Sequence, residues 1–118
     1  MPKALPTVDI TDPVCCSPIG AGVMAADDAL GIALRLKALG DPVRVQLMSM
    51  LLAEPETGVC TCDLAPAVDL SEATVSHHLK QLRDAGLVEG TRKGANVWYR
   101  PRPESLGALC RVIDPTCC

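Results

Sequence analysis

The chain has 118 residues, a formal net charge of −3 and only two aromatic residues, Trp98 and Tyr99. This length suits one domain with one modest core, and an odd count of seven cysteines, four of them in two adjacent pairs, excludes a fully paired secreted disulfide scaffold. Because no apolar run approaches about 18 residues and the early apolar stretch is preceded by aspartates, we expect a cytoplasmic thiol protein with no membrane segment.

The chain divides into an arm, a domain and a tail. Residues 1–25 are rich in proline, glycine and small side chains, which predicts an extended arm that carries the adjacent cysteines Cys15 and Cys16. Residues 26–114 carry the periodic patterns of a folded domain, and residues 115–118 form a short C-terminal tail.

Two helices are expected at the start of the domain. The first runs from a cap at Asp27 or Asp28 to Leu39, and its predicted apolar face holds Leu30, Ala33, Leu34 and the edge residue Lys37. The second begins at Asp41 and Pro42, a capping residue followed by a proline in the first turn. The apolar side chains predicted to bury this second helix are Leu47, Met48, Leu51 and Leu52.

The middle of the chain has the spacing of a helix-turn-helix. A short helix over 62–67 and a turn over 68–70 precede a longer helix that Ser71 caps and Gly86 ends. On the longer helix the apolar residues Val75, Leu79 and Leu82 share one face. The other face is polar or small and is predicted to read DNA, together with the capping residue; its candidate contacts are Ser71, Thr74, Ser76, His77, Lys80 and Gln81.

A β-hairpin and a last helix complete the predicted fold. Strands over 87–92 and 96–100 flank a turn at Gly94, and a helix over 104–113 places Leu106, Leu109, Cys110 and Ile113 on one face. The fold class is thus mainly α with a small β-hairpin (α+β), a winged helix-turn-helix. The wing offers Arg92 and Lys93 to DNA, and residues 77–102 hold six bases against two acids, although the whole chain is acidic.

Three segments resemble the ArsR/SmtB family of metal-sensing winged-helix repressors. They are residues 36–44, residues 74–88 and the cysteine-containing segment 60–64. The resemblance implies a homodimer formed through the first and last helices. It implies binding to double-stranded operator DNA without any cofactor, and release when an inducer derepresses a metal- or metalloid-resistance operon. It also implies a regulator rather than an enzyme.

The cysteines are the candidate sensor. Thiolates favour soft ions, and As(III) or Sb(III) needs three converging sulfurs. We expect Cys15, Cys16 and Cys60 to supply them, with Cys62 as substitute or fourth ligand. The founding arsenic sensors of the family carry a third cysteine where Ala65 stands here, so another group must complete the site, and we expect the arm to do so within one subunit or between two.

Other interpretations stay open. Cd(II) or Pb(II) would suit a four-thiol site that includes Cys62, and oxidation of Cys60 and Cys62 would make a redox-sensing regulator. Cys110 is expected to pack in the core, whereas Cys117 and Cys118 could form another site with it or a frayed tail. An arsenate reductase of the phosphatase type is disfavoured, because no cysteine is followed six residues later by arginine.

Overall fold

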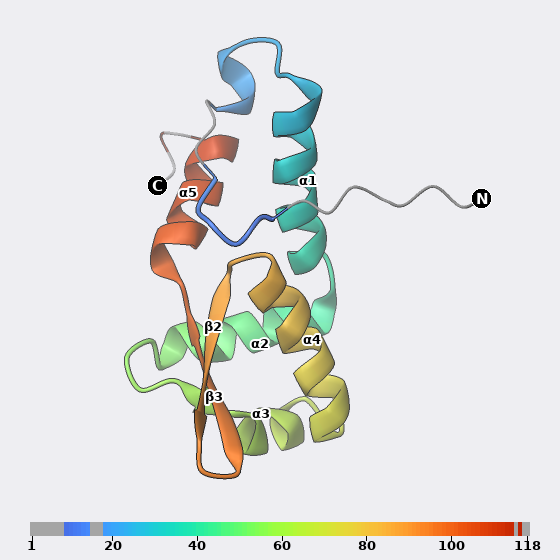
Figure 1. The fold of residues 1–118 in the computed structure, drawn as a ribbon, viewed down its shortest axis with the longest axis vertical. Helices are drawn as coiled ribbons and strands as arrows, with labels where there is room; N and C mark the ends of the chain where they lie inside the picture. Colours follow the sequence, from blue (N-terminus) through green and yellow to red (C-terminus); the bar gives the residue numbers. More distant parts are fainter. Residues whose placement is uncertain (1–8, 15–17, 115, 117–118) are drawn as a thin grey trace, which may run out of the picture.

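The computed structural model describes residues 9–14, 18–114 and 116 (Figure 1). Figure 1 places α1 and α5 in one half of the molecule and the tip of the β2–β3 hairpin at the far end of the other half. None of the helices in these ranges is long and apolar enough to cross a membrane. The elements are η1 (Ile19–Ala21), α1 (Ala26–Leu39), α2 (Pro42–Ala53), β1 (Val59–Cys60), α3 (Thr61–Ala67), α4 (Glu72–Asp84), β2 (Val88–Lys93), β3 (Asn96–Pro101) and α5 (Pro103–Ile113).

Local capping chemistry sets the start of two helices. The Asp41 carboxylate accepts the backbone N–H groups of Val43 and Arg44 at 2.9 and 3.3 Å, ahead of α2. The Ser71 hydroxyl likewise accepts the N–H of Thr74 at 3.2 Å, ahead of α4. Each bond satisfies an N–H that the first turn of a helix leaves unpaired, so both predicted starts are confirmed.

The start of α1 differs from the prediction. Its N-cap is Ala25, which has no side-chain oxygen to offer, while Asp27 and Asp28 lie in the first turn. There the two carboxylates face the positive end of the helix dipole, so they stabilise the start electrostatically instead of by capping. Gly40 ends the helix as expected, although with a φ of −78° it does not use the left-handed conformation.

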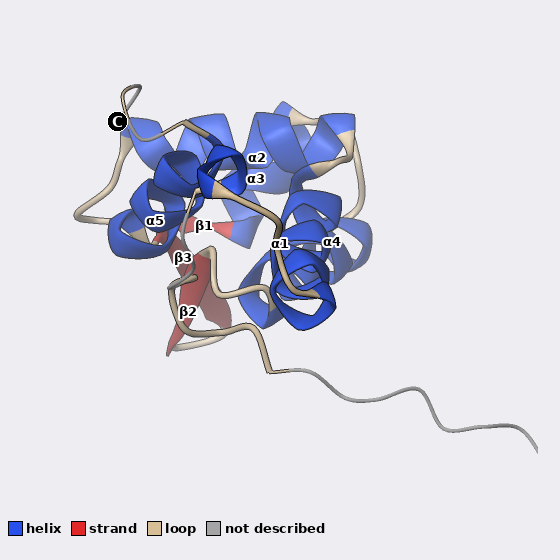
Figure 2. Cartoon of the chain, turned by 90° about the horizontal axis from the view of Figure 1, so that it is seen from above, coloured by secondary structure: helices blue, strands red, loops and turns tan. Residues whose placement is uncertain are grey.

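The predicted hairpin is present, as part of a three-stranded antiparallel sheet. Its order is β1-β3-β2, and the short strand β1, which the sequence did not reveal, pairs Val59 with Tyr99 and Cys60 with Trp98. The hairpin closes through a turn at Gly94, whose φ of 66° is strained for any residue with a Cβ. Seen from above, the hairpin projects from one side of the helices (Figure 2), which is the arrangement of a wing.

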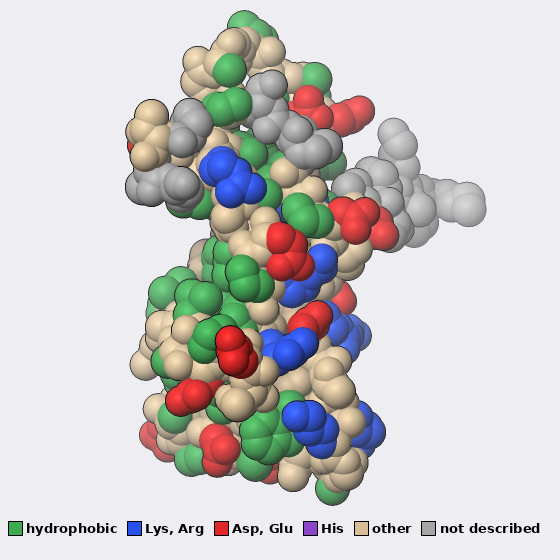
Figure 3. Space-filling view, turned by 90° about the vertical axis from the view of Figure 1, so that its left-hand side faces the viewer, with side chains coloured by type: hydrophobic (Ala, Val, Ile, Leu, Met, Phe, Trp, Pro, Cys, Tyr) green, Lys and Arg blue, Asp and Glu red, His purple; other side chains and the backbone are tan. Residues whose placement is uncertain are grey.

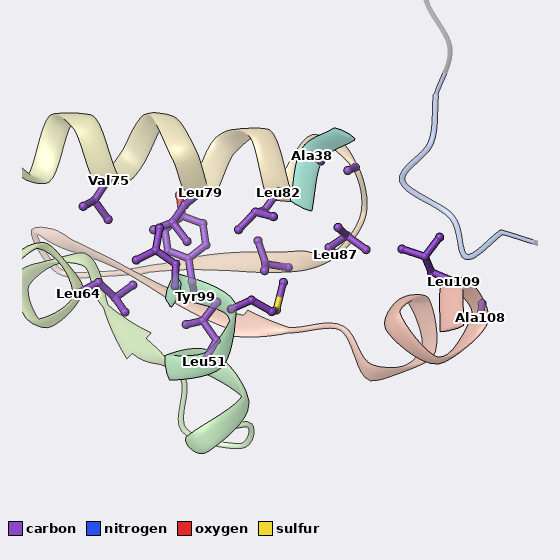
Figure 4. Close-up of a cluster of buried hydrophobic side chains, with 14 of the residues drawn as sticks. Ala38, Leu51, Leu64, Val75, Leu79, Leu82, Leu87, Tyr99, Ala108 and Leu109 are labelled. Carbon is purple, nitrogen blue, oxygen red and sulfur yellow. The ribbon is translucent and has the colours of Figure 1, made fainter. Parts of the chain in front are cut away.

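The core holds α4 against the sheet and α2. Val75, Leu79 and Leu82 are fully buried, as predicted, and point from α4 toward Tyr99, Leu51 and Leu64 (Figure 4). Burial of apolar area of this kind is the main favourable term in folding. The orientation of α4 therefore depends on this one cluster.

The structure confirms that Leu47, Met48 and Leu51 of α2 are buried, and it corrects one residue on each of three predicted apolar faces. Leu52 of α2 is 50% exposed, Leu30 of α1 is 43% exposed and Ile113 of α5 is 53% exposed. The residues buried within the subunit are Ile32, Arg35 and Ala38 on α1, and Ser105, Ala108, Leu109 and Val112 on α5. The buried side of α1 thus differs from the predicted stripe, whereas on α5 the predicted Leu109 is buried and Leu106 packs against the core.

Part of the N-terminal arm packs on the domain. We call Asp9–Val14 the strap; it begins with a turn in which Asp9 accepts bonds from Thr11. Val14 at its end is only 9% exposed and joins the core cluster. The division of the chain into arm, domain and tail stays a prediction, because residues 1–8 and 15–17 lie outside the described ranges.

Adjacent leucines of α2 provide a matched test of the core. We expect Leu51→Ala to lower the free energy of unfolding by about 2–5 kcal/mol, because it removes a fully buried side chain and leaves a cavity. Leu52→Ala should cost less than about 1 kcal/mol, since that side chain is half exposed. Urea unfolding followed by circular dichroism measures both, and equal losses would contradict the described packing.

The turn that begins the strap should depend on pH. Hydrogen bonds from the Thr11 hydroxyl and then from the Thr11 amide hold the pKa of Asp9 below the ordinary value of 3.8. The turn should therefore be fully formed above that value and be lost as the pH falls through the lowered pKa. NMR titration of the Asp9 carboxyl carbon checks this; a midpoint equal to that in the urea-unfolded chain would refute it, and Asp9→Asn should abolish the transition.

Candidate nucleic-acid interface and thiol site

The helix-turn-helix is built from α3, residues 68–70 and α4. Asp69 in the turn has a φ of 57°, in the left-handed region that a short polar side chain tolerates better than most. The backbone N–H of Leu70 donates to the carbonyl of Ala65 at 3.1 Å, which closes the turn against α3. Because α3 also packs on α4, the two helices form one rigid reading unit.

The outward face of α4 carries the predicted DNA contacts. Thr74, Ser76, His77 and Lys80 are exposed, and Gln81 is half-buried. The Ser71 hydroxyl is occupied as the cap and also donates to the Thr74 hydroxyl at 2.9 Å. The structure thus brings the six predicted residues of this helix region onto one accessible side, opposite the buried apolar face.

The two histidines of α4 have separate roles. His78 is half-buried, and its Nδ1 accepts a hydrogen bond from Arg44 Nε at 3.1 Å. The same guanidinium donates to the carbonyl of Ala38 at 3.2 Å, so Arg44 of α2 ties α4 to the end of α1. Sequence reasoning missed this residue, although a single charged side chain, one turn after Asp41 on a mainly apolar helix, is a signal for such a structural bond.

Residues 77–102 carry six basic side chains, but three of them lie beside an acidic side chain in the structure. Arg100 pairs with Glu89 at 2.6 Å, Arg102 with Glu104 at 3.2 Å, and Arg83 lies 3.9 Å from Asp84; these six side chains neutralise one another in part. Lys80, Arg92 and Lys93 remain as exposed cations, with Lys93 Nζ 5.2 Å from the Trp98 ring. In the lower half of Figure 3, Lys and Arg side chains lie along one edge and acidic side chains along the other.

Cys60 and Cys62 lie together where β1 meets α3. Their Cα atoms are 5.1 Å apart and their sulfurs form a disulfide. Cys60 is fully buried, and its Sγ accepts the backbone N–H of Cys62 at 3.0 Å as the N-cap of α3, whereas Cys62 is exposed. A ligand arriving from solvent therefore meets Cys62 first, an asymmetry that the cysteine spacing alone does not reveal.

The described residues cover the remaining cysteines only in part. Cys15, Cys16, Cys117 and Cys118 lie outside the described residues, and Cys110 is half-buried on α5. Within residues 9–14, 18–114 and 116, no three His, Cys, Asp or Glu side chains are grouped to hold a metal ion. The described part of the chain thus offers two convergent thiols, and a three-thiol site needs a further cysteine.

Known sequences match the chain over most of its length. Residues 41–90 match the family described as bacterial regulatory protein, arsR family. A transcriptional repressor SmtB homolog of Synechocystis is 46% identical over 91 residues, covering 77% of this chain and 67% of that protein. A putative arsenical resistance operon repressor of Halobacterium salinarum, ArsR2, is 34% identical over 91% of this chain and 86% of its own length.

Solved structures share the fold. The antimony-specific transcriptional repressor AntR superposes with a TM-score of 0.64 at 28% identity, over 76% of this chain and 80% of that one. A homodimeric winged helix-turn-helix DNA-binding domain from Mycobacterium bovis gives a TM-score of 0.60 at 27% identity, over 78% and 85%. The order of helices, the polar face of α4, the wing and these likenesses together show that the chain belongs to the ArsR/SmtB family of winged-helix transcriptional repressors.

Proposed function

We propose that this protein is a dimeric repressor that leaves its operator when cysteine thiolates capture As(III) or Sb(III). The observation that carries the proposal is the position of Cys60 and Cys62 at the start of α3, the helix that packs directly on the DNA-reading helix α4. A ligand that joins these thiols acts on the support of α4 without touching its DNA face.

The DNA half of the proposal uses α4 and the wing. The exposed face of α4 enters the major groove, where Ser76, His77 and Gln81 reach base edges and Lys80 reaches phosphate. Arg92 and Lys93 on the wing contact the adjacent backbone. Phosphate contacts by these three cations supply affinity, and the acidic remainder of the chain limits indiscriminate binding.

Two copies are needed to place two reading helices on successive major grooves, about 34 Å apart. The exposed apolar side chains of α1 and α5, among them Leu30, Leu36 and Ile113, give a surface that a second copy would cover. The homodimeric relative from Mycobacterium bovis supports this assembly. Operator DNA places the protein in the cytoplasm, where thiols are kept reduced.

The thiol chemistry requires the reduced protein. Reduction of the Cys60–Cys62 bond frees both sulfurs, and each can bind a trivalent ion after losing its proton. Cys60 then supplies one thiolate of the pyramidal complex, and Cys15 and Cys16, from the same subunit or the partner, supply the other two, with Cys62 as the substitute. ArsR2 and AntR, relatives named for arsenical and antimony regulation, support this choice of ligand.

Release then follows from coupling between the two sites. Drawing the Cys60 sulfur out of its buried position shifts the start of α3, and α3 carries α4 with it. The ion need only favour the free form over the DNA-bound form by a few kcal/mol to empty the operator. The same step with Cys62 as a fourth ligand would suit Cd(II) or Pb(II) instead.

One observation favours a second candidate function. Because the Cys60 and Cys62 sulfurs lie within bonding distance, a peroxide could oxidise both thiols to the disulfide, taking two electrons and two protons and being reduced to water or an alcohol. DNA release by peroxide in the absence of any metal would establish this redox regulator.

The proposed phosphate contact can be tested through its salt dependence. We expect Lys80→Ala to weaken operator binding and to reduce the slope of log K against log salt by about 1, because one phosphate contact is lost. Arg111→Ala, which removes an exposed base from the last turn of α5, should leave the slope unchanged. Fluorescence anisotropy of a labelled promoter fragment at several salt concentrations measures both, and equal slopes for Lys80→Ala and the wild type would refute the contact.

The thiol site can be tested by anaerobic titration of the reduced protein on its promoter fragment. Arsenite should release the wild type at about one ion per subunit, as a three-thiolate complex requires. Cys15→Ser, Cys60→Ser and the pair Cys15→Ser with Cys16→Ser should each raise the arsenite concentration needed at least tenfold. A protein with Ser at 110, 117 and 118 should respond normally, and loss of its response would move the site to the C-terminal cysteines.

Mixed dimers decide whether the site lies within or between subunits. One subunit carries Ser at 15 and 16, and the other carries Ser at 60 and 62. A site between subunits leaves one complete set of thiols in the mixed dimer, so part of the arsenite response returns, whereas a site within one subunit leaves none. Release by cadmium alone would support the four-thiol alternative, and release by no ion would overturn the proposed function.

A further inference from the structure

The strap is held by an arginine at the start of α5. Arg102 donates from its guanidinium to the carbonyl of Thr11 at 2.6 Å, and its Nε pairs with Glu104 at 3.2 Å. The backbone N–H of Arg102 donates to the carbonyl of Leu87 at 2.9 Å, three residues beyond the end of α4. One residue thus joins the strap, the end of the reading helix and the start of α5.

A second arginine holds the strap from α1. Arg35 is only 8% exposed, and its guanidinium donates to the carbonyl of Asp12 at 2.8 Å and to that of Gly31 at 2.9 Å. A buried cation stays charged and costs stability unless hydrogen bonds replace its water. Because the strap supplies one of the two carbonyls, it helps to offset the cost of burying the Arg35 guanidinium.

The end of α4 is shaped to receive the strap. Gly86 has a φ of 73° and lies so close to Thr11 that an added Cβ would overlap the carbonyl oxygen of that residue. Gly94, at the tip of the wing, has a similar φ of 66° but nothing within 4 Å of the same position. Glycine at 86 therefore meets two demands, turn geometry and room for the strap, whereas Gly94 meets the first alone.

The strap also lines a groove beside the reading helix. Ile10 lines a groove of about 430 Å³ with residues of α1, α2 and α4. From α4 and its end the groove takes Gln81, Asp84 and Ala85, and from α2 it takes Arg44, the residue that bonds His78. Movement of the strap therefore changes the surroundings of the last turn of α4 on two sides.

We infer that the strap couples the N-terminal arm to the reading helix, with Arg102 and Arg35 as the positioning residues that fasten it. The chain continues from Val14 at the end of the strap into Cys15 and Cys16. The coupling to an ion rests on the proposed function. When the arm captures an ion, it pulls on the strap, which is attached to both α4 and α5. The arm thiols thereby act on the C-terminal end of α4, while Cys60 and Cys62 act through α3.

The ion-free coupling is tested first by amide hydrogen exchange of the full-length dimer. Arg102→Gln removes the charged bond to Thr11, and Glu104→Gln removes the ion pair but leaves that bond in place. We expect Arg102→Gln to raise exchange about tenfold in both the strap and residues 82–87, and Glu104→Gln to leave both unchanged. Faster exchange in the strap alone would show that loosening the strap does not affect the end of α4, and this would overturn the inference.

The glycines supply a second matched pair. Gly86→Ala and Gly94→Ala impose the same unfavourable φ, but only the first displaces the strap. Gly86→Ala should raise exchange in the strap and add little in the presence of Arg102→Gln, because both changes act on one attachment. Gly94→Ala should leave the strap unchanged, and an equal effect of both glycine variants would contradict the assignment.

The link to ion sensing is tested by the ratio of operator affinities measured with and without arsenite. A purely structural role of Arg102 would leave this ratio unchanged. Arg102→Gln should reduce that ratio about tenfold while changing the ion-free affinity less than about threefold. An unchanged ratio together with a loosened strap would overturn the inference. A wild-type protein that does not respond to arsenite would instead contradict the proposed function. The hydrogen-exchange measurements would then decide whether the strap and α4 are coupled.

Discussion

The burial of one side of α4 is the constraint on which the rest of the molecule depends. Val75, Leu79 and Leu82 have no exposed area, and they lock the helix onto α2, α3 and the sheet. Because these side chains fill one face completely, the opposite face is left to solvent and to DNA. Any force that tilts α4 must act through its neighbours, since the helix has no freedom to rotate on a close-packed core.

The neighbouring segments contact α4 differently at its two ends. At the N-terminal end the turn through Asp69 joins it to α3, which begins at the buried Cys60. At the C-terminal end Gly86 and Leu87 meet the strap and Arg102. Four of the seven cysteines lie along the same two routes, Cys60 and Cys62 at the start of α3 and Cys15 and Cys16 directly after the strap in sequence. The reading helix is thus placed between two thiol-bearing segments.

The elements that could be predicted are those that local chemistry determines. Two helices begin at capping residues, Asp41 and Ser71, which bond backbone groups two or three positions further along the chain. Both partners of each bond are therefore visible in a short stretch of sequence. Burial on α1, α2 and α5 was harder to predict, because Leu30, Leu52 and Ile113 are apolar at helical spacing yet remain 43%, 50% and 53% exposed in the subunit. Periodicity identifies an apolar stripe, and only the tertiary arrangement says which surface covers it.

The register of the small sheet has a consequence for spectroscopy. Cys60 of β1 stands directly across from Trp98 of β3, the single tryptophan of the chain, and directly opposed residues in an antiparallel pair have Cβ atoms about 4.5–5.5 Å apart. The indole ring also lies under Lys93 at the tip of the wing. We therefore expect the intrinsic emission of this one unlabelled residue to respond to the redox or ligand state of the Cys60 sulfur and to the position of the wing cation.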